Sequence, residues 1–177
     1  MTVPHLSPPV SDRDHAQGPA EAPALLVMFG DYECPYTRRA HQAVRQVRGE
    51  LGDRFRFAFR NFSLTEIHPH ALRAALAAEA ADAQGRFWEM HDLLFARQKV
   101  LEDADLARYA AELGLDAERM GRDVAARDHL ARIEEDVVSG ERSGVEGTPT
   151  LFLNGLRHED GYDAETLRAT LLAAGNR

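Results

Sequence analysis

The chain has 177 residues and a mass of 19.7 kDa, the size of one domain, and 44% of its residues are hydrophobic, as is ordinary for a globular protein. Its net charge of −8 argues against a general nucleic-acid binder, because such proteins neutralise phosphates with a basic surface. A single cysteine, Cys34, excludes a scaffold built on internal disulfides, so any redox role needs a sulfur from another molecule.

The first 23 residues hold five of the eight prolines, and no basic region followed by an apolar core marks them as a secretory signal. No apolar run approaches the roughly 18 residues that a membrane span requires. We therefore expect a cytoplasmic protein without a membrane partner. A flexible tail is expected over residues 1–10 and a folded domain over residues 11–177.

The first part of the domain predicts a strand, a helix and a second strand. Residues 24–29 are a continuous apolar run followed by Gly30, which is typical of a strand buried on both faces. Residues 35–48 carry apolar side chains along one helical face, with a proline at the start and Gly49 at the end. In residues 54–59, three phenylalanines alternate with arginine and alanine, which predicts a second strand.

A helical block is predicted over residues 63–142. Its sequence predicts helices over 71–84 and 86–97, two short helices with Asp103 and Asp116 as N-caps, and a longer helix with Leu130, Ile133 and Val137 on its buried side.

The chain then returns to strand. Residues 150–153 and 156–158 flank Asn154-Gly155, a pair that accepts the positive φ of a tight hairpin turn. A last helix follows, with Asp163 as its N-cap. This order of elements predicts a small open α/β sheet with a helical subdomain inserted over about 63–142.

Cys34 is predicted to lie where a buried strand gives way to a helix. Unpaired N–H groups and the helix dipole favour the thiolate there, so its pKa is expected below that of a free cysteine. The thiolate is the species that attacks disulfides and peroxides. The alternative interpretation is a small buried core residue. The flanking Glu33 and Pro35 argue against it, because side chains at such turns tend to be exposed.

Residues 34–37 have the sequence Cys-Pro-Tyr-Thr directly after the predicted strand, and similar family-like segments follow at 60–62, 85–92 and 144–150. Together they resemble the DsbA-like branch of the thioredoxin-fold superfamily, whose motif is Cys-Pro-Tyr-Cys, and they keep that family's order from roughly residue 10 to the end of the chain. The resemblance implies a thioredoxin-like fold with an inserted all-helical subdomain.

The resemblance also implies roles for individual residues. Cys34 matches the attacking cysteine, and Pro35 and Tyr36 complete the contact surface beside it. Pro149 matches the family's cis-proline. Thr148 matches the preceding residue, whose backbone pairs with a bound peptide or glutathione and whose hydroxyl could tune Cys34.

Thr37 stands where the family has its second, resolving cysteine. A mixed disulfide at Cys34 must therefore be resolved by an outside thiol, for which glutathione is the obvious co-substrate; no bound cofactor is expected. The Thr37 hydroxyl could instead donate a hydrogen bond to the Cys34 thiolate. The resulting hypothesis is a monothiol thiol–disulfide oxidoreductase that acts through mixed disulfides with glutathione or protein thiols.

Residues 36–60 contain seven arginines and two acidic residues, a local charge of +5 around the thiol. Arg38 and Arg39 lie in the first helical turns beside Cys34, where they would stabilise the thiolate and meet the carboxylates of glutathione. The alternative is that these arginines form only the solvated face of an amphipathic helix.

Two other functions stay open at this point. In a one-cysteine peroxidase or sensor, peroxide would convert Cys34 to a sulfenic acid. A redox-inactive peptide-binding module would use the backbone edge at Thr148. No metal site is expected, because His68 and His70 lack a cysteine or carboxylate cluster at ligand spacing and His91 lies on an apolar helix face. His41, about two helical turns beyond Cys34, is too far away to act as its base.

Overall fold

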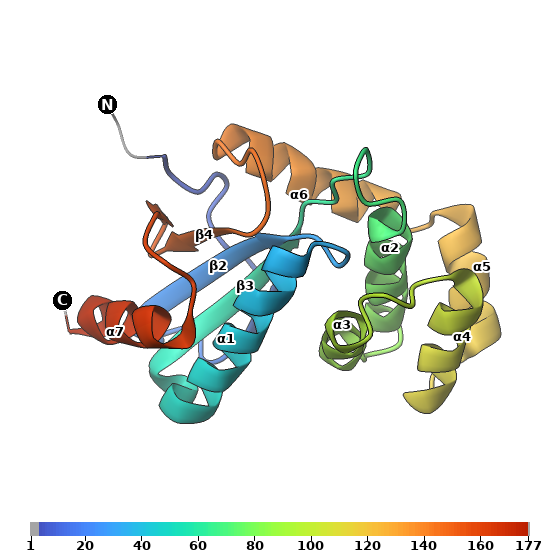
Figure 1. Ribbon diagram of the computed structural model, residues 1–177, viewed down its shortest axis with the longest axis horizontal. Coiled ribbons are helices and arrows are strands. Elements are labelled where there is room, and N and C mark those ends of the chain that lie inside the picture. The colour runs from blue at the N-terminus through green and yellow to red at the C-terminus, as the bar shows by residue number, and fades with distance from the viewer. Residues whose placement is uncertain (1–3, 177) are drawn as a thin grey trace.

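The computed structural model describes residues 4–176, which form a five-stranded sheet with helices packed on both faces (Figure 1). The strand order is β1-β3-β2-β4-β5, and β2 and β3 are parallel while the other neighbours are antiparallel. The strands are β1 (His15–Gln17), β2 (Ala24–Gly30), β3 (Phe55–Asn61), β4 (Thr150–Leu153) and β5 (Leu156–His158). The helices are α1 (Pro35–Leu51), α2 (Ala71–Asp82), α3 (Phe87–Ala96), α4 (Asp103–Glu112), α5 (Ala117–Ala126), α6 (Leu130–Arg142) and α7 (Ala164–Gly175), with a short 3-10 turn at Gly52–Arg54.

Strand β2 is buried on both faces, as its continuous apolar run predicted. Leu26 and Met28 point into the main core beneath α1 and α7, while Val27 and Phe29 point into a second core on the opposite face. Helix α6 covers part of that opposite face, and its Gly140 lies so close that an added Cβ would meet Phe29 and a neighbouring phenylalanine ring. Successive strand residues alternate between faces, so a strand covered on both sides needs apolar residues throughout.

The helical block lies between β3 and β4 in the chain and beside the sheet in space (Figure 1). Helix α2 is its centre and contacts α3, α4, α5 and α6. Its seven alanines are all fully buried. Alanine lets the four neighbouring helices approach closely, while Arg73 and Asp82 lie on the part of α2 that reaches solvent.

Several local predictions need correction. Helix α1 continues past Gly49 to Leu51 and ends at Gly52, which has a positive φ of 53°. Glu102 rather than Asp103 is the N-cap of α4, in a reciprocal capping box with Asp105. Strand β1 was not predicted, because three residues are too few to show a period.

Residues 4–7 do not form the loose tail that the prolines suggested; residues 1–3 lie outside the described part of the chain. His5 forms a β-bridge with Leu156, and the Leu6 N–H donates to the Gly155 carbonyl at 2.8 Å. The Ser7 N–H donates to Ser143 Oγ at 2.8 Å. This segment therefore extends the sheet at its β5 edge.

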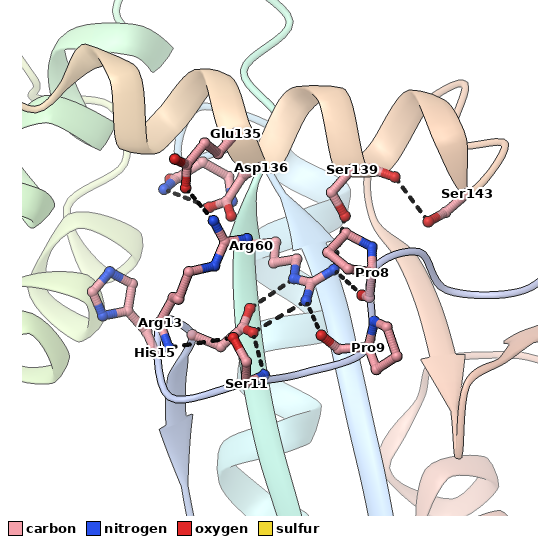
Figure 2. A network of polar contacts seen from close by, with 12 residues as sticks. Pro8, Pro9, Ser11, Arg13, His15, Arg60, Glu135, Asp136, Ser139 and Ser143 are labelled. Carbon is pink, nitrogen blue, oxygen red and sulfur yellow. Dashed lines mark hydrogen bonds and ion pairs between the residues drawn. The ribbon is translucent and has the colours of Figure 1, made fainter.

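Arg60, which the sequence analysis counted in the positive segment around the thiol, lies in strand β3 and is only 1% exposed. Its guanidinium forms two hydrogen bonds with the Asp14 carboxylate, at 2.7 and 3.1 Å. Figure 2 shows the remaining donors directed at the carbonyls of Pro8 and Pro9 and at Ser139 Oγ. This network explains why the positively charged Arg60 side chain is tolerated beside the second core, because each of its N–H groups donates to an acceptor.

We predict that Asp14→Asn lowers the free energy of unfolding by about 3 kcal/mol, because removing one member of a buried ion pair leaves the other charge uncompensated. Urea denaturation at neutral pH measures the loss. Arg13→Gln is the matched control, since the Arg13–Glu135 ion pair is about half exposed on both sides and is expected to contribute under about 1 kcal/mol. Equal effects of the two substitutions would contradict this account.

Low pH should destabilise the fold through the same Asp14–Arg60 ion pair. Burial by itself would raise the pKa of Asp14, but hydrogen bonds from Arg60 and the Ser11 N–H outweigh it and hold the pKa below its ordinary value. A lowered folded-state pKa stabilises the fold above the unfolded-state pKa of about 3.9, and the stabilisation is lost as the pH falls through the folded value. The difference between wild type and Asp14→Asn should therefore shrink in that acid range.

Candidate active site

Cys34 is the N-cap of α1, at the end of the turn that follows β2. Its N–H donates to the Asp31 carbonyl at 3.1 Å, and its own carbonyl accepts the Arg38 N–H at 3.1 Å. Pro35 occupies the first helical turn, as predicted. The expectation of an exposed cysteine is wrong, because Cys34 is only 3% exposed. A loop 114 residues further along the chain packs against its sulfur.

That loop carries Thr148 and Pro149. The peptide bond between them is cis, as the resemblance implied. The Cys34 sulfhydryl donates to the Thr148 carbonyl at a sulfur–oxygen distance of 3.4 Å. Thr148 Oγ1 is buried and has no hydrogen-bond partner among residues 4–176, so this hydroxyl makes no hydrogen bond with the cysteine. The structure therefore brings Cys34, Thr148 and Pro149 together, through the backbone of Thr148.

Thr37 lies in the first turn of α1 and is fully buried. Its hydroxyl oxygen accepts a long hydrogen bond of 3.4 Å from the Asp31 N–H. The predicted donation to Cys34 is absent from the hydrogen bonds of the described chain. Thr37 therefore supports the turn from inside, and the resolving position holds a group without redox chemistry.

The surface beside Cys34 is formed by Pro35 and Tyr36. Both are exposed, Tyr36 to 56%, and the Arg39 guanidinium lies 5.6 Å from the centroid of the Tyr36 ring. Arg38 is half-buried, and its Nε has no partner within residues 4–176. An exposed aromatic ring with an adjacent cation suits contact with a polypeptide or a small anionic thiol.

The arginine-rich segment does not surround the thiol as a unit. Arg60 is in the Asp14 network described above. Arg48 donates to the Gln17 carbonyl, and Arg45 lies near Asp92 on α3. Only Arg38 and Arg39 lie in the first turns of α1, beside Cys34. The local charge of +5 thus overstates the positive charge near the sulfur.

Asp31 is a residue of the site that sequence reasoning missed. It is fully buried, and its carboxylate accepts hydrogen bonds from the Glu33 N–H at 2.7 Å and the Leu64 N–H at 2.8 Å. The His68 Nδ1 lies 2.9 Å from the same carboxylate. The only sequence signal was an aspartate directly after a buried strand, a common turn residue.

Gln98, between α3 and α4, is a second missed residue. Its side-chain amide donates to the Tyr32 carbonyl at 2.9 Å and to the Cys34 carbonyl at 2.8 Å. The helical insertion therefore holds the backbone of the cysteine turn directly. No local pattern marks a glutamine for this role, because its partners are more than sixty residues away.

Glu33, next to Cys34, is held by His70. The His70 N–H and ring Nδ1 contact the Glu33 carboxylate at 2.7 and 2.9 Å, and His70 Nε2 lies 2.9 Å from Glu102 at the start of α4. The hydrogen bonds with Glu33 and then Glu102 raise the pKa of His70 above its ordinary value. His70, at the start of the helical insertion, therefore joins the cysteine turn to the beginning of α4, and protonation of its ring strengthens both contacts.

Outside these contacts, histidines and carboxylates converge at two places in the described chain, at His41, His91 and Asp92 and at His15, Glu79 and Asp82. Neither group includes Cys34. His68 and His70, considered from the sequence as metal ligands, contact Asp31 and Glu33 instead.

Comparison with known proteins places the fold. A family model described as "Thioredoxin" matches residues 11–173. Oxidised BdbD from Bacillus subtilis has a TM-score of 0.87 and 19% identity, covering 99% of this chain and 100% of BdbD. A thioredoxin-like oxidoreductase from Silicibacter pomeroyi has a TM-score of 0.81 and 26% identity, covering 94% of this chain and 95% of the other. These likenesses confirm the predicted DsbA-like thioredoxin fold with its helical insertion.

Curated relatives share more sequence but are much longer. The chain is 48% identical over 163 residues to a protein of Salinispora arenicola named Na(+)/H(+) antiporter NhaA 1, covering 92% of this chain and 25% of that protein. It is 43% identical over 174 residues to a protein of the same name from Mycolicibacterium vanbaalenii, covering 97% of this chain and 28% of that protein. The chain thus spans about a quarter of these relatives. Within residues 4–176, no helix has the length and apolar character to cross a membrane.

We predict that His70→Gln destabilises the protein most at low pH. A raised folded-state pKa stabilises the fold below the unfolded-state value of about 6.5, and the contribution is lost as pH rises through the folded value. For a partly exposed histidine the effect should reach about 1 kcal/mol at most. Urea denaturation of both proteins at pH 5.5 and 8.5 measures it.

Glu102→Gln provides the matched control for this histidine. It removes one of the two carboxylates and should remove part of the pH-dependent difference while leaving the Glu33 contact in place. A difference between wild type and His70→Gln that stays constant between the two pH values would show that His70 acts only by packing.

Proposed function

Because this chain belongs to the thioredoxin family, we propose that it is a monothiol thiol–disulfide oxidoreductase whose attacking group is the Cys34 sulfur. The general chemistry has support from the fold, since its structural neighbours include proteins named as a thioredoxin-like oxidoreductase, a thiol-disulfide exchange protein and a thiol-disulfide oxidoreductase. The monothiol cycle is our inference from this chain's own residues.

One observation carries the proposal. The sulfur of Cys34 faces the carbonyl before cis-Pro149, while the resolving position three residues later holds Thr37. The sequence contains one cysteine, so no internal disulfide can form. The chain keeps the attacking arrangement without the second thiol, which leaves resolution to a thiol from outside.

The cycle has two balanced steps. The Cys34 thiolate attacks one sulfur of a glutathione mixed disulfide; the substrate S–S bond breaks, a Cys34–glutathione disulfide forms, and the substrate thiolate leaves and takes a proton. A second glutathione thiolate then attacks this disulfide, giving oxidised glutathione and the Cys34 thiolate. The substrate gains two electrons, and two glutathione units end as one disulfide.

The surroundings of Cys34 support contacts with both substrates. The exposed Pro35 and Tyr36 offer an apolar surface, and Arg38 and Arg39 offer positive charge to carboxylates of glutathione. The backbone at Thr148 offers an edge for an extended segment once the cysteine sulfur has reacted. We place this cycle in a reducing, glutathione-containing compartment, the cytoplasm.

Exposure to oxidised glutathione should give one glutathione adduct per chain, located on Cys34 by mass spectrometry of its peptides. The adduct should disappear on addition of reduced glutathione, because the second step regenerates the thiolate. Cys34→Ser is the control and should take no adduct. Unmodified protein after exposure would contradict the proposal and favour the redox-inactive peptide-binding module; rapid consumption of peroxide without an adduct would favour the peroxidase.

Restoring the resolving cysteine should change the cycle. In Thr37→Cys, a second thiol in the first turn of α1 can attack a mixed disulfide at Cys34, so an internal disulfide forms and the outside thiol is released. We predict that the variant reduces about one protein disulfide per chain without glutathione and ends with its own internal disulfide, whereas the wild type stops at the mixed disulfide until glutathione is added. Thr37→Ser keeps the hydroxyl and is the matched control. A glutathione-independent wild type would contradict the monothiol cycle.

A further inference from the structure

A cavity of about 220 Å³ lies between α1 and α3. Val44, Phe57 and Trp88 give it apolar walls. Three potential ligands face it: His41 from α1, and His91 and Asp92 from α3. One ligand atom from each of the three residues lies within 4.8 Å of the ligand atoms of the other two.

His91 is fully buried, and its ring has a defined orientation. Its Nδ1 lies 2.8 Å from the hydroxyl of Tyr32, which is itself 1% exposed. Its Nε2 has no hydrogen-bond partner among the described residues. A buried ring nitrogen without a partner is costly unless something binds it.

His41 presents the second nitrogen. It is 4% exposed and its ring stacks on Phe95, with centroids 4.6 Å apart. Its Nε2 lies 3.2 Å from Asp92 Oδ1, within ion-pair distance but outside hydrogen-bond geometry, and so also lacks a partner within residues 4–176. Two imidazole nitrogens thus converge on one carboxylate without satisfying one another.

We propose that His41, His91 and Asp92 bind a divalent transition-metal ion of the Zn²⁺ class, with the remaining coordination position open to the cavity. Two imidazoles and a carboxylate are a ligand set that such ions take, commonly with water in the fourth position. The Tyr32 hydroxyl would accept the Nδ1–H of His91 and thereby leave Nε2 free for the ion, as outer hydrogen bonds of metal-binding histidines do.

The ligand atoms must move closer together to hold an ion. Zinc lies about 2.0–2.1 Å from nitrogen and about 2.0–2.2 Å from carboxylate oxygen, so two ligand atoms of a tetrahedral ion are about 3.4 Å apart. The observed spread of up to 4.8 Å closes if a side chain rotates. Asp92 is able to do so, because its side chain is 40% exposed at the edge of the cavity.

The second cluster shows the difference between a ligand site and a satisfied network. His15 Nε2 lies 3.0 Å from each oxygen of Glu79, and Asn61 donates to the same carboxylate at 3.1 Å. His15 also stacks on Phe87 at 3.5 Å. These groups already have partners, so we infer no ion there.

The positive charges beside the cavity decide which variants are informative. Arg45 lies 3.8 Å from Asp92 Oδ2, and its side chain is 62% exposed, so it competes with an ion for the carboxylate but is free to move away. Arg48 also lines the cavity. An anion would gain from both arginines and be repelled by Asp92, whereas a cation would show the reverse dependence. Substituting Arg45 therefore distinguishes the two ligands.

The test is zinc titration of the Cys34→Ser protein, in competition with a chromophoric chelator, so that the thiol does not contribute a ligand. We expect one Zn²⁺ per chain. His41→Gln and Asp92→Asn should each weaken binding at least tenfold, and Arg45→Gln should strengthen it. Circular dichroism checks the fold of every variant. The exposed Asp92→Asn keeps the test informative if substitution of a buried histidine unfolds the chain.

Three results would overturn the proposal. The first is the absence of stoichiometric Zn²⁺ binding by folded Cys34→Ser protein. The second is unchanged affinity in folded His41→Gln or Asp92→Asn. The third is weaker zinc binding by Arg45→Gln together with loss of phosphate binding, which would assign the cavity to an anion. None of these readouts depends on thiol chemistry, so the outcome is independent of the proposed function.

Discussion

The Asp31 carboxylate is fully buried where β2 ends, and the geometry of the candidate active site depends on the donors it collects. Two backbone N–H groups and the His68 ring contact it, from the cysteine turn and from the segment that follows β3. A buried carboxylate without donors would cost several kcal/mol, so the chain adopts the path that brings these groups to it. The backbone of the same residue accepts the Cys34 N–H, and the cysteine turn is therefore fixed from both sides.

This arrangement explains how the site keeps its form without a second cysteine. The contacts that position Cys34 come from the Asp31 backbone, the Gln98 amide and the Thr148 carbonyl. None of them involves the residue at position 37, whose own hydrogen bond is a long one to the Asp31 N–H. In the proposed cycle, a threonine at position 37 changes which reactions can be completed, and the contacts that hold the Cys34 sulfur do not depend on it.

Local signals in the sequence predicted much of the fold. Asn154 and Gly155 have φ values of 48° and 83° in the hairpin turn, and the Asp116 and Asp163 side chains accept N–H groups at their helix starts. These features depend on neighbours within a few residues, so their residue types carry the information. Strand β2 was predictable from its residue types as well, because a strand covered on both faces requires an unbroken run of apolar residues.

The missed features depend on contacts that sequence spacing cannot show. Cys34 was expected to be exposed because it follows a strand at a turn, but a segment 114 residues later covers its sulfur. Gln98 and Asp31 have ordinary neighbours in sequence, and only the fold gives them their partners. His41 and His91 are fifty residues apart on two helices, each on a face that otherwise indicates core packing, so their convergence follows from the packing of α3 on α1.

Helix α1 is where these separate features meet. Its first turn carries Cys34 and is held by Gln98 of the insertion, and farther along the same helix His41 faces α3 of that insertion. The stacking of His41 on Phe95 and the contact of Tyr32 with His91 make this boundary aromatic as well as polar. The insertion contacts α1 at two places, at the cysteine turn through Gln98 and farther along the helix through His41. With both contacts in place, the insertion cannot rotate about one of them without breaking the other. The orientation of α1 against the insertion, and with it the position of the sulfur opposite Thr148, is therefore determined by both contacts together.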